Sequence, residues 1–124
     1  MKLYTLILIA LLGANAQAEQ KYNTHTGKWE TVKPNATLQY NSMEDTWQYA
    51  QPDARPTYNA MEDNWELAPE DSQNKYNTHE DRWQITSPES ELRYNTHENE
   101  WNYVDPDETI EYNAHEDAWE FPQD

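Results

Sequence analysis

The sequence has no cysteine, only two glycines and a single phenylalanine in 124 residues. Without cysteine the chain forms no disulfide and no thiolate metal site, which are common stabilising devices of small exported domains. With two glycines it has no glycine-rich loop of the kind that cradles a phosphate group. P-loop chemistry is therefore excluded, and the fold must be stabilised by other side chains.

Basic residues are also scarce, because 8 Lys and Arg stand against 24 Asp and Glu, which gives a formal net charge of −16. A surface of this charge repels nucleic-acid phosphates and anionic lipid headgroups. The same surface attracts divalent cations and basic partners. We therefore expect no nucleic-acid partner.

Long hydrophobic runs are absent beyond one apolar stretch of about ten residues, 3–12. This stretch is too short to cross a bilayer, which takes roughly 20 residues. It follows Lys2 and precedes Ala16 and Ala18 in an A-x-A pattern, as in a Sec-type signal peptide. We predict a signal peptide at residues 1–18, no membrane span after its cleavage, and export to the periplasm or the exterior of a bacterial cell. An uncleaved anchor helix is the alternative.

Large aliphatic residues are rare in the remaining chain. Residues 19–124 keep 7 basic and all 24 acidic residues, for a charge of −17. Their large aliphatic residues are Val32, Leu38, Leu67, Ile85, Leu92, Val104 and Ile110. A composition of this kind leans toward disorder. Six Trp and eight Tyr in the same range, at regular positions, favour an ordered domain instead.

A nine-residue motif recurs six times, and each copy starts 18 residues after the previous one. The copies are YNTHTGKWE at Tyr22, YNSMEDTWQ at Tyr40, YNAMEDNWE at Tyr58, YNTHEDRWQ at Tyr76, YNTHENEWN at Tyr94 and YNAHEDAWE at Tyr112. A fixed period is typical of repeat proteins, whose units bury their apolar faces against their neighbours. We predict one repeat domain at 19–124, with repeats that start near residues 20, 38, 56, 74, 92 and 110.

Each motif fits a β-hairpin with a four-residue loop. In the fourth copy Tyr76 faces Trp83, Asn77 faces Arg82, and THED forms the loop. The last loop position carries only Gly, Asp or Asn, which tolerate the left-handed conformation. The Asn at the loop entrance can accept a hydrogen bond from the backbone two residues on, as in an Asx-turn. The predicted turn-forming residues are Asn23, Gly27, Asn41, Asp45, Asn59, Asp63, Asn77, Asp81, Asn95, Asn99, Asn113 and Asp117.

Strand alternation predicts two unlike faces for each hairpin. Tyr, Trp, the residue two before Tyr and the residue two after Trp share an apolar face. The other face carries Asn and its polar neighbours, and we expect it to be solvated. The first copy has Gln20 and Thr31 at the flanking apolar positions, which indicates a solvated terminal cap. Nothing in the sequence explains Pro56 and Asn74 at the same kind of position.

The predicted fold is all-β: a tandem array of six hairpins, wound as a hairpin solenoid or a curved meander and held by a Tyr/Trp ladder. Each facing Tyr–Trp pair contributes about 0.5–1.5 kcal/mol beyond the area that it buries. Proline in the connectors ends strands and blocks edge pairing. The predicted pairs are Tyr22–Trp29, Tyr40–Trp47, Tyr58–Trp65, Tyr76–Trp83, Tyr94–Trp101 and Tyr112–Trp119. The sequence leaves open whether the array closes.

The Y-N-x-x-E-D-x-W pattern resembles the hairpin of kelch repeats, in which a Tyr-Asp or Tyr-Asn pair precedes a turn and a Trp. It is also similar to the aromatic hairpin repeats of bacterial cell-wall-binding modules. The resemblance covers about nine residues of each copy. Kelch units are longer, about 50 residues, and carry a glycine pair that these copies lack. The glycine-rich motif of the cell-wall-binding modules is also missing. The resemblances imply a hairpin in each copy and no particular activity.

Catalysis is not indicated by the repeated motif. An enzyme needs one asymmetric group of nucleophile, acid and base in a pocket. The serines Ser42, Ser72, Ser87 and Ser90 occupy unrelated repeat positions, and acidic residues recur in every later turn. We therefore predict no catalytic residue and a protein that is not an enzyme.

We expect a binding or structural module of the cell envelope. Aromatic rings that stay exposed can stack on a glycan or hold a cationic group of an envelope protein. The rival interpretation is a purely structural module, which would bury all its rings in its own core or, by self-association, against a second copy.

Metal binding is the alternative function, because one loop position holds only His or Met, and both are copper ligands. The candidate ligands are His25, Met43, Met61, His79, His97 and His115. Neighbouring Glu-Asp pairs offer oxygen ligands to calcium, although no copy has the loop of a high-affinity calcium site. We therefore expect no resident cofactor and, on this alternative, weak copper or calcium binding.

Overall fold

The computed structural model describes residues 18–122, which form twelve strands and no helix. The predicted signal peptide lies outside the described residues, apart from Ala18. The first strands of the hairpins are β1 (Glu19–Asn23), β3 (Thr37–Asn41), β5 (Arg55–Asn59), β7 (Gln73–Asn77), β9 (Glu91–Asn95) and β11 (Glu111–Asn113). The second strands are β2 (Lys28–Val32), β4 (Thr46–Ala50), β6 (Asn64–Ala68), β8 (Arg82–Thr86), β10 (Glu100–Val104) and β12 (Ala118–Glu120).

Consecutive strands pair as six antiparallel hairpins, which we number 1 (β1–β2) to 6 (β11–β12). In hairpin 4, Tyr76 pairs with Trp83 and Asn77 with Arg82, and the other five hairpins have the same register. The prediction of an all-β array of six hairpins is confirmed. The register follows from the four-residue turn, because the turn fixes which residues face each other.

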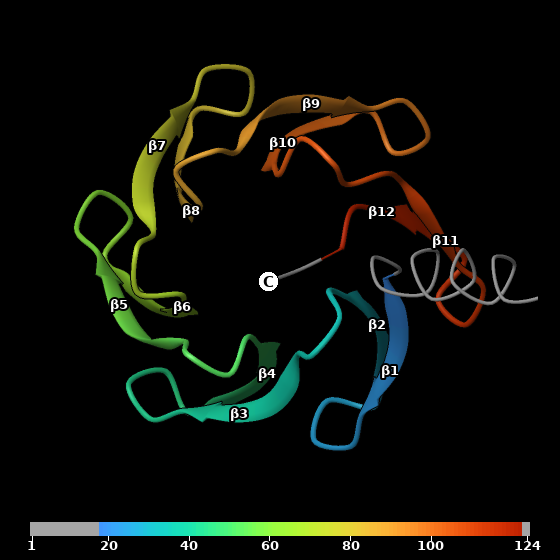
Figure 1. Cartoon of the computed structure of the whole chain (residues 1–124), viewed down its shortest axis with the longest axis horizontal. Helices are drawn as coiled ribbons and strands as arrows, with labels where there is room; N and C mark the ends of the chain where they lie inside the picture. Colours follow the sequence, from blue (N-terminus) through green and yellow to red (C-terminus); the bar gives the residue numbers. More distant parts are fainter. Residues whose placement is uncertain (1–17, 123–124) are drawn as a thin grey trace, which may run out of the picture.

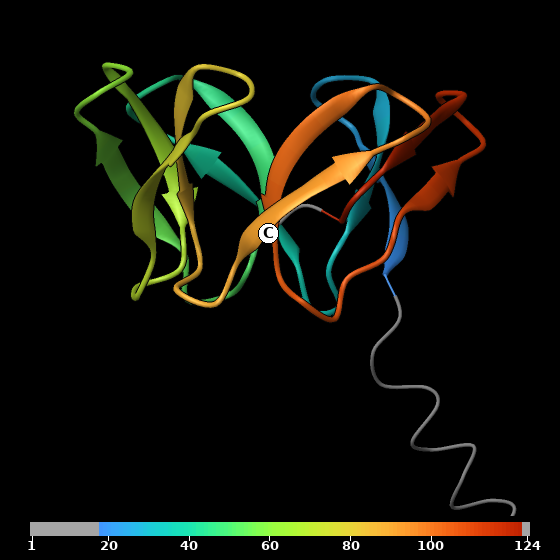
Figure 2. The ribbon, with the colours of Figure 1, turned by 90° about the horizontal axis from the view of Figure 1, so that it is seen from above.

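The six hairpins stand around a common axis as a closed ring (Figure 1). No ladder joins one hairpin to the next among residues 18–122, so each is a separate two-stranded sheet. The second strand of each hairpin lies nearer the axis (Figure 1). In the side view all turns lie along one edge of the ring and all connectors along the opposite edge (Figure 2). The sequence left open whether the array closes, and in the structure it does (Figure 1).

The prediction of a solvated second face was wrong for the turn-entrance Asn residues, although strand partners such as Arg82 are exposed. The turn-entrance Asn residues, on the face expected to be wet, are 0–2% exposed, whereas the motif Tyr residues are 38–45% exposed. The reason is that hairpins in a ring stack face to face, so a neighbour covers the polar face. The terminal cap was also wrong: Thr31 is fully buried, because hairpin 6 covers hairpin 1 and the ring has no end.

Small side chains form the core near the axis. The residue three after each Trp is buried in hairpins 1 to 5, where it is Val32, Ala50, Ala68, Thr86 or Val104. Compact side chains suit this position because the second strands converge there and interiors pack densely. The structure also explains Asn74, whose Nδ2 donates to Oδ1 of the buried Asn59 in the preceding hairpin at 3.0 Å. Nothing in the structure explains Pro56.

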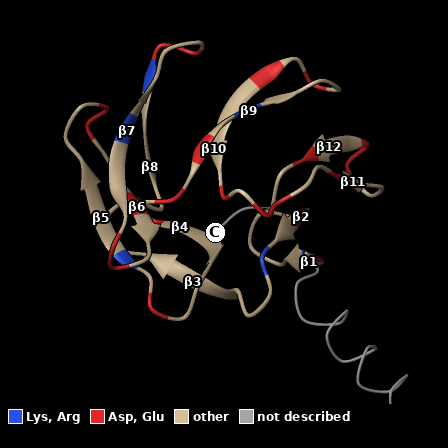
Figure 3. Cartoon of the chain, turned by 45° about the horizontal axis from the view of Figure 1, so that its top comes forward, with Lys and Arg blue, Asp and Glu red and all other residues tan. Residues whose placement is uncertain are grey.

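Acidic residues dominate the turns and connectors, and basic residues are few (Figure 3). Within residues 18–122, no helix has the length and hydropathy that crossing a bilayer requires.

Candidate functional site

The turn residues adopt the conformation that their residue types predict. The last loop residue has positive φ in all six hairpins, from 54° to 77°. Each turn-entrance Asn accepts backbone hydrogen bonds at Oδ1 from the residues two and three positions later, at 3.0–3.3 Å. The Asn side chain is thereby fixed, and its Nδ2 group points toward the next hairpin.

The same Asn joins neighbouring hairpins. Its Nδ2 donates to the backbone carbonyl of the Trp in the next hairpin, at 2.8–3.1 Å, in every one of the six joints. The sixth of these bonds runs from Asn113 to Trp29 and closes the ring. A buried amide without partners would be costly, so these bonds explain how a buried polar residue at this position is tolerated.

A loop glutamate makes a second contact at each joint except one. Its Oε2 accepts from the backbone N–H of the next Trp at 2.9–3.1 Å. These residues are Glu44, Glu62, Glu80, Glu98 and Glu116. Hairpin 1 has Thr26 at this position. Sequence reasoning missed this role, although the recurrence of Glu at one loop position was a visible signal.

The loop histidines make a third contact at the joints. The rings of His25, His79, His97 and His115 stack on the Trp of the next hairpin, with centroids 3.9–4.1 Å apart and planes within 13°. In hairpins 2 and 3 Met43 and Met61 hold this position and are 53% and 58% exposed. These six residues are the candidate metal ligands, and each lies at a different joint. In the described part of the chain, no group of three His, Cys, Asp or Glu has a metal-holding arrangement.

The tryptophans pack at the joints and are half-buried. One side of each Trp faces its own Tyr, with tilted rings and centroids 5.1–5.4 Å apart, as the predicted ladder requires. In four joints the other side carries the stacked histidine described above. The Trp rings therefore serve the architecture, and four of them also carry a stacked histidine from the neighbouring hairpin.

The tyrosines, by contrast, are open. We call the six exposed rings the tyrosine rim: Tyr22, Tyr40, Tyr58, Tyr76, Tyr94 and Tyr112. In hairpins 2, 3, 4 and 6 the phenol O–H donates to the Asp that ends the turn, at Asp45, Asp63, Asp81 and Asp117. These hydrogen bonds raise the pKa of each of the four phenols, with smaller contributions from burial and from the carboxylate charge. The rim therefore presents neutral rings beside carboxylates.

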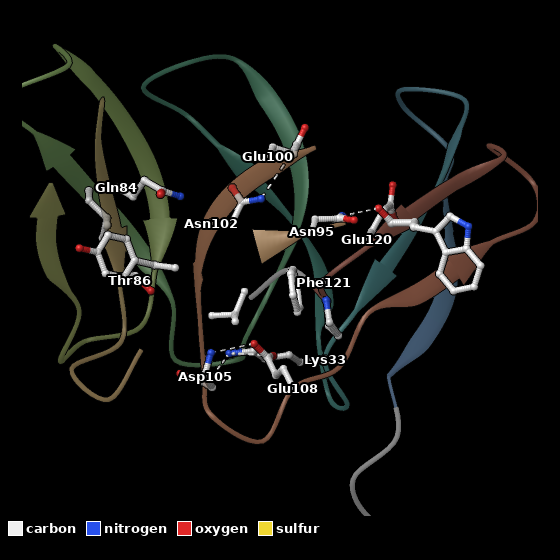
Figure 4. Close-up of a pocket in the computed structure, with 15 residues that line it drawn as sticks. Lys33, Gln84, Thr86, Asn95, Glu100, Asn102, Asp105, Glu108, Glu120 and Phe121 are labelled. Atoms are coloured by element: carbon white, nitrogen blue, oxygen red, sulfur yellow. Dashed lines mark hydrogen bonds and ion pairs between the residues drawn. The ribbon is translucent and has the colours of Figure 1, made fainter. Parts of the chain in front are cut away.

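A cavity of about 340 Å³ lies on the inner side of the ring between hairpins 4, 5 and 6 (Figure 4). Hairpin 5 has Asn102 directly after its Trp, where the other five hairpins have Glu or Gln. The shorter Asn102 side chain donates from Nδ2 to Glu100 at 3.2 Å and accepts at Oδ1 from Arg82 at 2.9 Å. Seven of the fifteen lining residues carry an amide or a carboxylate, so water or a small polar molecule suits this space.

Lys33 makes two ion pairs in the lower part of this cavity (Figure 4). Lys33 Nζ lies 2.7 Å from Asp105 and 3.4 Å from Glu108, which joins the connector after hairpin 1 to that after hairpin 5. Burial raises the pKa of Asp105. Hydrogen bonds from Lys33 and Ser87, and the charges of Lys33 and Lys75, outweigh burial, so the pKa of this carboxyl is lowered overall. The carboxyl of Asp105 is therefore ionised at neutral pH.

In comparisons with known proteins, no family model, no curated protein and no solved structure matches this chain.

Proposed function

We propose that this protein is an exported, non-catalytic binding module of the cell envelope that contacts its partner through the tyrosine rim. The observation that carries the proposal is the contrast between the two kinds of aromatic residue. The Trp rings are partly covered at the joints, whereas six Tyr residues are 38–45% exposed around one closed ring. An exposed aromatic ring can stack on a sugar or hold a cationic group.

Repetition supports the proposal further. The ring presents the same exposed side chain six times, so a ligand with several copies of one group engages several sites at once. Linked binding events of this kind raise overall affinity without any new contact. A glycan chain and an envelope protein both offer repeated groups.

The test is saturable binding of residues 19–124 to isolated bacterial envelopes, measured by co-sedimentation. Tyr58→Ser with Tyr76→Ser removes two neighbouring rim rings, and we expect at least about tenfold weaker binding because avidity is lost. Tyr58→Phe with Tyr76→Phe is the matched control, since it keeps both rings. Far-ultraviolet circular dichroism verifies that both variants fold. Unchanged binding by a folded Tyr→Ser variant would refute the proposal.

A further inference from the structure

We propose that the partner of the tyrosine rim is a protein segment that carries Lys or Arg side chains, each placed on a Tyr ring beside a carboxylate. This inference rests on the proposed function and names the chemistry of its ligand. It follows from the groups that surround each exposed ring, from the charge of the chain, and from the places where the chain's own cations lie.

Four rim sites combine a ring with a fixed anion. The carboxylates of Asp45, Asp63 and Asp117 accept from their tyrosines at 2.6–2.7 Å, and Tyr76 donates to Asp81 in the same way. Each of these Asp residues uses Oδ1 for the phenol, which leaves Oδ2 available on an exposed turn. A cation over the ring face meets the negative side of the aromatic quadrupole and lies near a carboxylate.

The chain uses this chemistry internally. Lys21 lies 5.8 Å from the ring centroid of Tyr49, Lys75 lies 5.6 Å from that of Tyr103, and Arg93 lies 5.7 Å from that of Phe121. These three aromatic residues lie two positions after a Trp and do not belong to the rim. Within residues 18–122 no cation of the chain lies over a rim tyrosine, so these rings remain open to an outside cation.

Net charge favours the same partner. The formal charge of −16 draws a basic segment toward the ring and repels an acidic one. An uncharged glycan stacks on a ring without needing the neighbouring carboxylate. The carboxylate is therefore the feature that separates the two ligand classes.

The six hairpins include natural variants of the site. Hairpin 5 has Asn99 in place of Asp, and Tyr94 still donates to it. Hairpin 1 has Gly27, which offers no side-chain acceptor to Tyr22. Asn99 has a φ of 60°, close to the 54–59° of the four Asp residues, so Asn is compatible with this turn. Asp→Asn substitutions on the rim therefore remove charge while they keep the turn, the ring and an acceptor.

The main experiment measures binding of an octa-arginine peptide to residues 19–124 by isothermal titration calorimetry. The rim variant carries Asp45→Asn, Asp63→Asn, Asp81→Asn and Asp117→Asn. The charge-matched control carries Asp53→Asn, Asp71→Asn, Glu89→Gln and Asp107→Asn, which change exposed connector residues on the opposite side of the ring. We expect at least about tenfold weaker binding by the rim variant, and a change of about twofold or less in the control. Equal loss in both variants means diffuse charge attraction and overturns the inference.

A gain of affinity is also expected. Gly27→Asp with Asn99→Asp raises the number of complete rim sites from four to six, and we expect about threefold tighter peptide binding. An addition of two carboxylates at exposed positions on the connector side, Asn35→Asp with Gln73→Glu, is the matched control for charge. Equal gains in both double variants contradict a site at the rim.

Envelope binding separates failure of this inference from failure of the proposed function. If Tyr58→Ser with Tyr76→Ser abolishes envelope binding and the four Asp→Asn changes leave it unaltered, the rim is the binding surface but its ligand is uncharged. This inference then fails while the proposed function stands. If neither variant alters envelope binding, both fail. Loss of binding in both variants, with the connector control unaffected, is the result that we expect.

Discussion

The joint that closes the ring differs from the joint that follows it along the chain. Between hairpins 6 and 1, Asn113, His115 and Glu116 all contact Trp29. Between hairpins 1 and 2, Asn23 and His25 contact Trp47 in the same way, but Thr26 supplies no carboxylate to its backbone N–H. The joint without a covalent connector therefore has the full set of contacts, and a connected joint lacks one.

This difference shows what a connector contributes. A short connector keeps two hairpins at high effective concentration, so the joint tolerates the loss of one hydrogen bond. The closing joint is held by non-covalent contacts alone, because hairpins 6 and 1 are the last and the first of the chain and no connector joins them directly. We therefore expect the closing joint to open more readily than the connected one when the same contact is removed.

Removal of the turn-entrance Asn is the largest perturbation of this comparison. Asn113 donates to Trp29 and Glu120 and accepts from two backbone N–H groups. Because these partners lose a buried amide, we expect Asn113→Ala to lower the free energy of unfolding by about 2–4 kcal/mol. For a domain of this size the melting temperature should fall by roughly 10–20 °C. Thermal unfolding followed by circular dichroism measures this loss.

Asn23→Ala is the matched variant, since Asn23 makes the equivalent four bonds. We expect Asn23→Ala and Asn113→Ala to have similar melting temperatures but different patterns of amide hydrogen exchange. In Asn113→Ala, strand β2 should exchange faster than the rest of the ring, because the unconnected joint opens locally. In Asn23→Ala, strand β4 should remain protected. Equal local exchange in the two variants would show that the connector has no effect.

Removing or adding the loop carboxylate should change the free energy of unfolding by an intermediate amount. Glu116→Ala removes the acceptor of the Trp29 N–H, and we expect a loss of about 1–2 kcal/mol in denaturant unfolding. Thr26→Glu installs the missing acceptor at the next joint, and we expect a gain of about 0.5–1.5 kcal/mol. A loss of stability in Thr26→Glu would contradict the role assigned to this loop position.

The smallest expected effect concerns the residue after Trp. Burial raises the pKa of Glu66, and Glu62 raises it further, while Asn59 and Arg82 lower it; the pKa is raised overall. A carboxyl whose folded-state pKa lies above its unfolded value destabilises the fold once it ionises, and this penalty disappears as the pH falls. We expect Glu66→Gln to raise the melting temperature by about 1–2 °C at pH 7, because partial exposure screens the effect.

The same variant should lose its advantage below about pH 4, where wild-type Glu66 is protonated. Gln48 and Gln84 occupy the equivalent position in hairpins 2 and 4, so the ring accepts Gln there. A melting-temperature difference that stays constant from pH 4 to pH 7 would contradict the electrostatic cause.

The local structure was readable from the sequence because its causes are local. The pairing of Tyr76 with Trp83 follows from a four-residue turn, and the positive φ of Asp81 follows from a residue type that tolerates it. The candidate site could be predicted from the sequence only in part. The sequence pointed to exposed aromatics, but it gave no reason to separate Tyr from Trp, since both lie on the same strand face.

The sequence by itself determined six hairpins, their register and their turns, since contacts within about nine residues fix these features. Only the tertiary structure decided which face of each hairpin is covered, because hairpins that stack around a ring cover even a polar face. Closure therefore turned Asn23 and Asn113 into buried joint residues and the loop histidines into stacking partners of Trp. Closure also left the motif tyrosines exposed, because the Asn, His and Glu side chains of the neighbouring hairpin make the contacts at each joint and do not cover the Tyr rings.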